Sequence, residues 1–198
     1  MPDPQPPEAD GAVLTARTRS LTETPALAQL AADLLQTPSM LGDMSDAELR
    51  CVVSYLRLAS FGAAATLFRE GDASNTGYML LILSGDVRVE AAPFADTNAI
   101  DVSVLGPGNV IGEMGLIDGA PRASTCTAVT AVHAAALSRK ALELMLVEHP
   151  AVAAKLMIAL AKRLADRLRA LVEQLGLYAR LAQDAKLELE RLTQAPRP

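Results

Sequence analysis

The chain has 198 residues, of which 51% are hydrophobic and 21% are charged, so it can bury a core and wholesale disorder is excluded. Aromatic residues make up only 3% and tryptophan is absent, which argues against stacking platforms for single-stranded nucleic acid. The formal net charge of -5 argues against a protein that coats nucleic acid or an anionic membrane through bulk electrostatics. Any anionic ligand is therefore expected to be bound locally.

The two cysteines indicate a reducing compartment. Cys51 and Cys126 are far apart in sequence and match no metal or redox spacing, so they are interpreted as small buried hydrophobes. The longest aliphatic runs are far shorter than the ~20 residues that span a bilayer, and no basic region precedes an apolar stretch at the N-terminus. We therefore expect a soluble, cytoplasmic protein that binds no metal and contacts no membrane.

The N-terminal part divides into a tail and two short helices. Residues 1–25 carry five of the twelve prolines, which predicts a disordered tail. Leu and Ala spacing over residues 26–36 suits a short helix. A second helix is predicted from Ser45 through Leu56, because Ser45 and Glu48 fit a capping box in front of an apolar run.

The middle of the chain has the texture of a small β unit. Short segments rich in β-branched and aliphatic residues are separated by glycines, which predicts a string of short antiparallel strands at residues 64–69, 77–84, 86–92, 100–105, 124–130 and 132–138. The sequence Ser84-Gly85-Asp86 between two apolar runs predicts a tight hairpin turn. Strands spaced this regularly are typical of a sandwich or a barrel.

The C-terminal part is predicted to be helical. Ser138 is expected to cap a helix over residues 139–148, and His149-Pro150 ends it. A long helix is then predicted from Ala151 to Gln194, with an unbroken apolar heptad seam made by Ala161, Leu164, Leu168, Leu171, Leu175, Tyr178, Ala182, Ala185, Leu189 and Leu192. The seam predicts a parallel homodimer through residues 161–192. The alternative is a helix that kinks or ends at Gly176 and folds back on its own chain.

The residues most informative about chemistry lie between Ile111 and Thr125. Gly112 allows a sharp turn after a strand, and residues 113–116 can then form one helical turn whose free N–H groups suit a phosphate. Glycine at positions 112 and 115 allows close backbone approach to a ligand, and Arg122 supplies a planar fork that matches phosphate oxygens. Glu113 accepts but cannot donate hydrogen bonds, so it suits a sugar hydroxyl. A nucleotide offers both groups.

This segment resembles the phosphate-binding cassette of the cyclic-nucleotide-binding domain family, which includes bacterial catabolite-activator regulators, regulatory subunits of protein kinase A and gated channels. The family pattern is matched by Ile111, Gly112, Glu113, Gly115 and Leu116, and then by residues 121–125, Pro-Arg-Ala-Ser-Thr. The likeness extends through residues 67–72, 83–87 and 105–108 and covers roughly residues 45 to 170.

The resemblance implies an α+β fold, an eight-stranded antiparallel jelly-roll barrel with N-terminal helices and a long C-terminal helix. It implies a 3′,5′-cyclic nucleotide as ligand, with Glu113 on the ribose 2′-hydroxyl and Arg122 on the cyclic phosphate. The expected ligand-binding residues are Gly112, Glu113, Met114, Gly115, Arg122, Ala123 and Ser124, with Leu83 and Val104 facing the sugar and base. Members that favour guanine often carry Ser or Thr directly after the arginine; Ala123 stands there, so cAMP is favoured over cGMP.

The resemblance also bears on domains and output. It divides the chain into the tail at 1–25, a nucleotide-binding domain at 26–150 and a dimerising helix at 151–198. Relatives of the catabolite-activator type contact adenine through hydroxyl residues on the long helix, whereas Arg167 and Leu168 stand at those positions here. Such relatives continue into a helix-turn-helix domain, but this sequence ends at Pro198, so direct DNA binding is not expected. Any output would pass through the dimer or through an unidentified protein partner.

Several alternatives stand beside the sensor hypothesis. The barrel could be an interaction module on a constitutive coiled-coil scaffold, with Glu113 and Arg122 simply pairing with each other. A haem or cluster sensor is disfavoured because His and Cys are few and badly spaced. His133 and His149 are interpreted as structural, and no base or nucleophile is placed for catalysis, so no enzyme activity is expected. The basic residues at 162, 163, 167 and 169 are interpreted as an exposed coiled-coil flank.

Overall fold

Two antiparallel sheets form the centre of the computed structural model, which describes residues 18–35, 44–91 and 101–194. One sheet has the order β1-β2-β9-β4-β7 and contains Arg19–Ser20, Arg57–Phe61, Val132–Ser138, Tyr78–Ser84 and Val110–Ile111. The other has the order β3-β8-β5-β6 and contains Thr66–Phe68, Thr125–Ala128, Val87–Ala91 and Asp101–Leu105. The expected α+β architecture with antiparallel strands and a long C-terminal helix is confirmed. The expected number of eight strands is not confirmed, because the described residues form nine strands.

The strand β4 shows how the layers are built. Six of its seven residues are buried, because both of its faces are covered. Tyr78, Leu80 and Ile82 point into the cluster between the two sheets, where they meet residues of β5 and β8. The alternate residues Met79, Leu81 and Leu83 belong to a second cluster, which contains the helices. The five-stranded sheet therefore lies between the other sheet and a helical layer.

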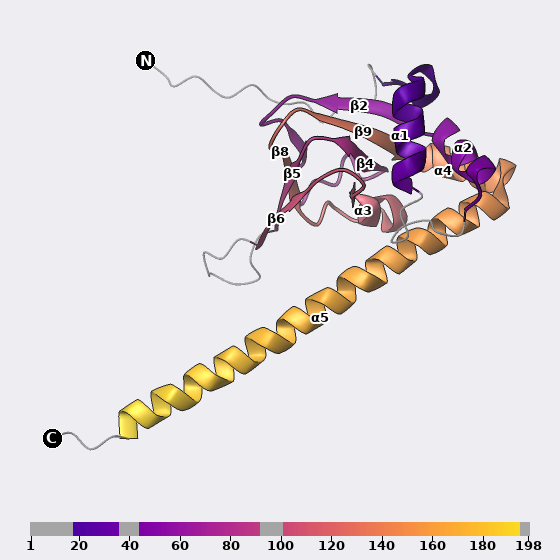
Figure 1. Cartoon of the computed structure of the whole chain (residues 1–198). Coiled ribbons are helices and arrows are strands. Elements are labelled where there is room, and N and C mark those ends of the chain that lie inside the picture. The colour runs from indigo at the N-terminus through magenta and orange to yellow at the C-terminus, as the bar shows by residue number, and fades with distance from the viewer. Residues whose placement is uncertain (1–17, 36–43, 92–100, 195–198) are drawn as a thin grey trace, which may run out of the picture.

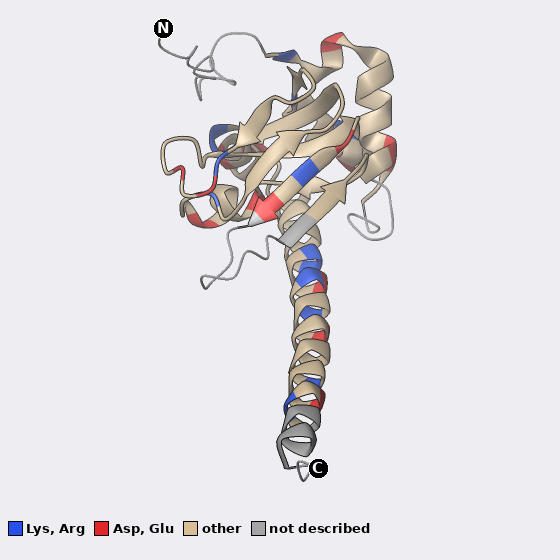
Figure 2. Ribbon diagram, turned by 90° about the vertical axis from the view of Figure 1, so that its left-hand side faces the viewer, with Lys and Arg blue, Asp and Glu red and all other residues tan. Residues whose placement is uncertain are grey.

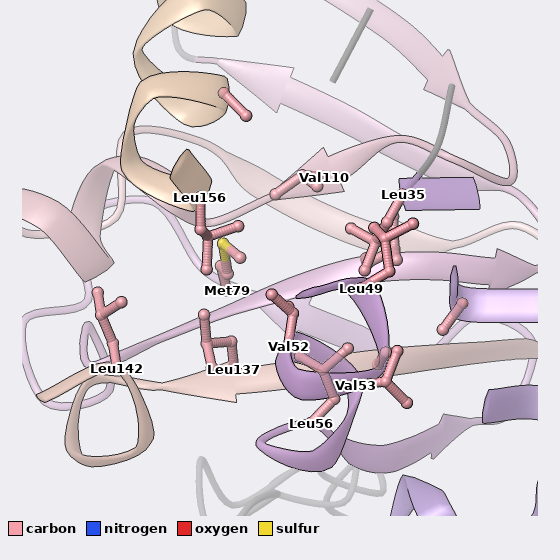
Figure 3. Packing of buried hydrophobic residues seen from close by; sticks show 14 of the residues in the cluster. Leu35, Leu49, Val52, Val53, Leu56, Met79, Val110, Leu137, Leu142 and Leu156 are labelled. Atoms are coloured by element: carbon pink, nitrogen blue, oxygen red, sulfur yellow. The ribbon is translucent and has the colours of Figure 1, made fainter. Parts of the chain in front are cut away.

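The helical layer contains α1 (Pro25–Leu35), α2 (Asp46–Ser54), α4 (Arg139–Glu148) and the first turns of α5 (Pro150–Gln194). Figure 3 shows their apolar side chains in one cluster with Met79 and Leu137 of the sheet, with Leu156 near Met79 and Leu49 near Leu35. The predicted capping box is confirmed, since the Ser45 hydroxyl accepts from the Glu48 N–H and the Glu48 carboxylate accepts from the Ser45 N–H. The Ser138 cap of α4 is confirmed as well.

Two local expectations need correction. The predicted tail does not extend to residue 25, because β1 pairs with β2 and Leu21 is completely buried; residues 1–17 lie outside the described part of the chain. The turn at Ser84-Gly85-Asp86 is not a hairpin, because β4 and β5 belong to different sheets. It is a corner that carries the chain from one sheet to the other. Gly85 is required there, since a Cβ would lie 2.2 Å from the Ala131 carbonyl oxygen.

The helix α5 extends far beyond the sheets as a single rod (Figure 1). It has 45 residues and runs without a break through Gly176. One face of its first turns is buried, whereas the seam residues beyond the sheets are largely exposed, Leu168 at 62% and Leu175 at 66%. Figure 2 shows charged residues of both signs along the helix. The side chains of Leu189 and Leu192 lie outside the described part. Beyond the first turns, the described seam has no packing partner among residues 18–35, 44–91 and 101–194.

Candidate functional site

A cavity of about 130 Å³ lies between the four-stranded sheet, the short helix α3 (Glu113–Asp118) and α5. The structure brings seven of the expected ligand-binding residues to its wall: Gly112, Glu113, Met114, Gly115, Arg122, Ala123 and Ser124. Residues that were not expected line the rest: Phe68, Val89, Ser103, Leu105, Ile111, Cys126 and Arg167.

The turn at Gly112 makes room for the arginine. Gly112 follows β7 and has a φ of 77°, which glycine adopts without the steric cost of a side chain. A Cβ at this position would lie 2.6 Å from Arg122 Nη1 and 2.8 Å from Phe68 Cζ. At Gly115 a Cβ would lie 3.3 Å from the same nitrogen. The two glycines therefore accommodate the guanidinium as well as opening the backbone to a ligand.

Arg122 is buried, with 4% of its surface exposed, and its guanidinium is contacted by backbone carbonyls and aromatic rings. Its Nη1 donates to the Gly112 carbonyl at 3.0 Å and its Nη2 donates to the Asn75 carbonyl. Its guanidinium carbon lies 3.9 Å from the centroid of the Phe68 ring and 4.7 Å from that of Tyr78. This fixes the plane of the fork against two aromatic rings.

The guanidinium of Arg122 has no carboxylate in direct contact among the described residues, and Asp72 acts on its charge only from a longer distance. Within residues 18–35, 44–91 and 101–194 it forms no ion pair, and its buried Nε has no hydrogen-bond partner. Burial lowers the pKa of Arg122 from that of an exposed guanidinium, although arginine stays protonated at any physiological pH. A buried cation with an unused donor is favourable only when an anion compensates it. The cavity beside it therefore suits an anionic group.

Glu113 carries the opposite charge and is also buried beside the cavity. It is 2% exposed, and its partner is Arg167 of α5, with Nη1 at 3.7 Å from Oε1. One turn earlier on the same helix, Arg163 donates to the Asn109 side chain at 3.2 Å and to the Val110 carbonyl at 3.5 Å. Burial lowers the pKa of Arg163 and the nearby Glu113 raises it in part.

These contacts revise two interpretations of the sequence. Arg163 and Arg167 face the sheets and the cavity, so the basic cluster is not wholly an exposed flank. Arg169 fits the flank interpretation, since it is largely exposed and pairs with Asp166. Glu113 and Arg122, which a vestigial site would pair with each other, have separate partners.

Two expected residues do not reach the cavity. Leu83 is buried in the cluster beneath the helices, because it lies on the helix-facing side of β4. Val104 is 59% exposed on β6, while its neighbours Ser103 and Leu105 line the cavity. Side chains alternate across a strand, so an error of one residue in the expected register puts the side chain on the wrong face. The apolar wall is therefore made by residues such as Val89 and Leu105.

The remaining candidate groups occupy structural positions. His133 is exposed on β9 and hydrogen-bonds the Ser60 hydroxyl at 2.8 Å, and His149 caps α4 against Tyr55. Cys126 is buried and Cys51 is half-buried, both as free thiols. Burial raises the pKa of Cys126 to about 11. In the described part of the chain no three metal-ligating side chains gather, and no helix is long and apolar enough to cross a membrane.

Comparison with known proteins agrees with this geometry. A family model described as the cyclic nucleotide-binding domain matches residues 58–149. The solved structure of a cyclic nucleotide-binding domain from Methylobacillus flagellatus is 31% identical, with a TM-score of 0.67 over 75% of this chain and 82% of that one. The Thermus thermophilus catabolite activator protein is 27% identical, with a TM-score of 0.60 over 71% of this chain and 63% of that one.

A protein of Mycobacterium tuberculosis, a CRP-like cAMP-activated global transcriptional regulator, is also similar. It is 27% identical over 133 residues, which are 67% of this chain and 58% of the regulator. The match therefore spans little more than half the length of that relative.

Proposed function

The chain belongs to the cyclic nucleotide-binding domain family, and on that premise we propose that it binds a 3′,5′-cyclic nucleotide in the cavity between Arg122 and Glu113. Its family role is regulatory, and we extend it to a sensor that passes ligand binding to a dimer or partner through α5. No catalytic step and no metal are part of the proposal.

The observation that carries the proposal is the state of Arg122. Its buried guanidinium stacks on Phe68, donates to two carbonyls and has an unpartnered Nε. A cyclic phosphate carries one negative charge and acceptor oxygens, so it would supply the direct ionic contact that the described residues do not give to Arg122. The Met114, Gly115 and Ala123 N–H groups are proposed to assist.

The rest of the nucleotide is assigned by chemistry. The Glu113 carboxylate accepts hydrogen bonds only and therefore suits the ribose 2′-hydroxyl. Val89 and Leu105 offer an apolar wall to the sugar and base. We favour cAMP over cGMP because Ala123, which has no hydroxyl, follows Arg122, and because the similar mycobacterial regulator is described as cAMP-activated.

The proposed output is a shift in the population of α5 positions. A ligand changes such an equilibrium only as far as it binds one position more tightly than the other. The exposed seam on α5 is proposed to form a parallel homodimer, with residues 26–150 as the binding domain and residues 151–198 as the output helix. We place this sensor in the cytoplasm without direct contact to DNA or membrane.

A constitutive scaffold is the second candidate. The exposed apolar residues of α5 favour it, since a coiled coil needs no ligand to form. In that case the cavity would be a remnant.

Calorimetric titration of the full chain with cAMP, cGMP and 5′-AMP tests the proposal. We expect saturable one-to-one binding of both cyclic nucleotides, tighter for cAMP than for cGMP. We expect much weaker binding of 5′-AMP, because its phosphate does not form a ring with the ribose and carries more negative charge. Absence of binding of either cyclic nucleotide at millimolar concentration would overturn the proposal and favour the scaffold.

A further inference from the structure

A residue outside the cavity holds part of the cavity wall. Arg139 is the first residue of α4 and does not line the cavity, but it contacts the short helix α3, which does. Its Nη2 donates to the Gly115 carbonyl at 2.7 Å, whereas its buried Nε has no hydrogen-bond partner in the described part of the chain. Nη2 is therefore the atom through which Arg139 acts on α3.

The position of this guanidinium is specified from both ends of the side chain. The Arg139 N–H donates to the Gly77 carbonyl at 2.7 Å, which fixes the backbone at the start of α4. At the other end the guanidinium packs on Gly119, the C-cap of α3, where an added Cβ would lie 3.2 Å from Nη1 and 3.3 Å from Nη2. Gly119 also has a φ of 73°, which a side chain would strain. The end of α3 is therefore shaped to receive this arginine.

A chain of hydrogen bonds leads from Arg139 to Arg122. The Gly115 carbonyl, which Arg139 holds, belongs to the same peptide group as the Leu116 N–H. That N–H donates to the Gly112 carbonyl at 3.3 Å, and the same carbonyl accepts from Arg122 Nη1 at 3.0 Å. Hydrogen bonds linked in this way polarise one another. Arg139 thus orients the peptide group that holds the acceptor of Arg122.

The helix α3 needs such a contact because it is short. It has six residues, so its conformation depends on packing against the rest of the protein more than on its own few hydrogen bonds. The Gly115 carbonyl accepts the Gly119 N–H at 3.0 Å within the helix and the Arg139 guanidinium from outside it. A cation close to the last carbonyls of a helix is also favourable electrostatically. Removing this donor should therefore loosen α3 and the Gly112 turn in front of it.

We propose that Arg139 is a positioning residue of the nucleotide site, which acts through α3 on the orientation of Arg122 and touches no ligand. This inference rests on the proposed function and adds a residue that lies outside both the cavity and the motif at 111–125. Because Arg139 acts on the phosphate-binding side of the site, its loss should weaken cAMP and cGMP by the same factor.

The binding test compares Arg139→Gln with two neighbouring variants. Ser138→Ala removes the cap of the same helix, since the Ser138 hydroxyl accepts from the Ala141 N–H at 3.2 Å, but it removes no hydrogen bond to α3. Lys140→Gln removes one exposed positive charge. We expect Arg139→Gln to weaken binding of both cyclic nucleotides about tenfold, the loss that corresponds to one charge-assisted hydrogen bond. Both neighbours should keep the wild-type affinity.

The variant Arg139→Lys tests the nature of the contact. Lysine keeps the positive charge and a donor that can replace Nη2, so it should recover part of the affinity that Arg139→Gln loses. Circular dichroism checks that each variant is folded. An equal loss in Ser138→Ala would mean that binding depends on the general stability of α4, and it would overturn the inference. Wild-type affinity in Arg139→Gln would overturn it as well and leave the proposed function intact.

Hydrogen exchange of amides 113–119 in the ligand-free chain provides a readout that needs no nucleotide. We expect faster exchange in Arg139→Gln than in the wild-type chain, and no such change in Ser138→Ala or Lys140→Gln. Unaltered exchange in Arg139→Gln would show that Arg139 does not hold α3 and would overturn the inference. If the wild-type chain binds no cyclic nucleotide, the proposed function fails, whereas faster exchange in Arg139→Gln would still support the positioning of α3.

Discussion

The guanidinium fork of Arg122 is held in place by contacts within the protein itself. Backbone bonds join it to the segment around Asp72, since the Arg122 N–H donates to the Asp72 carbonyl at 2.9 Å and the Gly71 N–H donates to the Arg122 carbonyl at 2.8 Å. Phe68 and Tyr78 cover its planar face. A rigid donor fork loses little conformational entropy on binding, so its full electrostatic attraction is available to the phosphate.

Replacing Arg122 by alanine should abolish most of the affinity. Truncating one partner of a buried charge-assisted contact costs about 2–5 kcal/mol, or a factor of roughly 30 to several thousand. Arg69→Ala is the matched control, because Arg69 is exposed and does not line the cavity. Fluorescence or calorimetric titration gives the affinities, and circular dichroism checks that both variants are folded. Unchanged affinity for Arg122→Ala would refute the assignment of the phosphate site.

Glu113→Gln should be milder, because the amide oxygen can still accept the bond from the 2′-hydroxyl. The informative ligand is the 2′-deoxy analogue, which lacks the donor. We expect the ratio of wild-type to Glu113→Gln affinity to be smaller for that analogue than for cAMP. Equal ratios would mean that Glu113 does not contact the 2′-hydroxyl.

Three glycine-to-alanine changes separate backbone strain from space around the arginine. Gly112 has a positive φ and no room for a Cβ, Gly71 has a φ of 78° with open space around it, and Gly62 has open space and no positive φ. We expect Gly62→Ala to be neutral, Gly71→Ala to lower the free energy of unfolding by about 1–2 kcal/mol, and Gly112→Ala to lower it further. Denaturant titration measures these values. Nucleotide affinity should fall strongly only in Gly112→Ala; full affinity there would contradict the close packing around Arg122.

At the scale of helices and strands, the sequence predicted best those features that depend on residues only a few positions apart. Ser45 and Glu48 cap α2 as expected, since a capping box is decided within four residues. The corner at Gly85 could not be told from a hairpin, because both join two apolar runs by a tight turn and differ only in which strands pair afterwards. The strand β2 was not expected either, because its hydrogen bonds go to the distant β9.

For the site, too, the success of the prediction depended on whether the residues lie close together in the sequence. Residues 112–115 and 122–124 were expected at the ligand because they lie close together in one motif, and the structure brings them to one cavity. Val104 depended on a strand register that sequence did not fix, and Ser103 and Leu105 take that wall instead. The sequence analysis placed Arg167 where relatives contact adenine from the long helix. Its contact with Glu113 is revealed only by the fold.

The exposed apolar seam of α5 predicts a dimer. One double substitution on this seam should dissociate that dimer into monomers. Leu171 and Leu175 are 44% and 66% exposed in the single chain, and full burial of such a side chain contributes about 1.5–3 kcal/mol. Several such residues are enough for association at micromolar concentration, which corresponds to about 8 kcal/mol. Leu171→Asp with Leu175→Asp should therefore yield a monomer by light scattering.

The control for this experiment is Leu177→Asp with Leu187→Asp. Both residues are exposed, at 56% and 49%, but lie off the heptad seam, so the dimer should persist. A wild-type chain that is already monomeric at high concentration would contradict the homodimer and indicate a different partner helix.

At the scale of the whole molecule, the cavity and α5 share a packed core. Leu116 of α3 belongs to the same buried cluster as Leu156 and Leu160 of α5, and Arg139 of α4 donates to the Gly115 carbonyl at 2.7 Å. Packed elements of this kind change position in discrete steps rather than by continuous deformation. In the proposed account, a phosphate bound at residues 112–122 would therefore act on the base of the 45-residue helix, and the far end of the helix would amplify any change in angle.

The distance between two spin labels at position 180, one on each copy, tests the sensor account most directly. Arg180→Cys places the label on an exposed residue off the seam, in a chain whose Cys51 and Cys126 are replaced by alanine and whose cAMP affinity has been checked. We predict that saturating cAMP changes the interspin distance or narrows its distribution, and that Arg122→Ala in the same background abolishes the change. Saturated binding with an unaltered distance distribution would contradict the account, because the nucleotide would then be a structural cofactor and α5 only a means of dimerising.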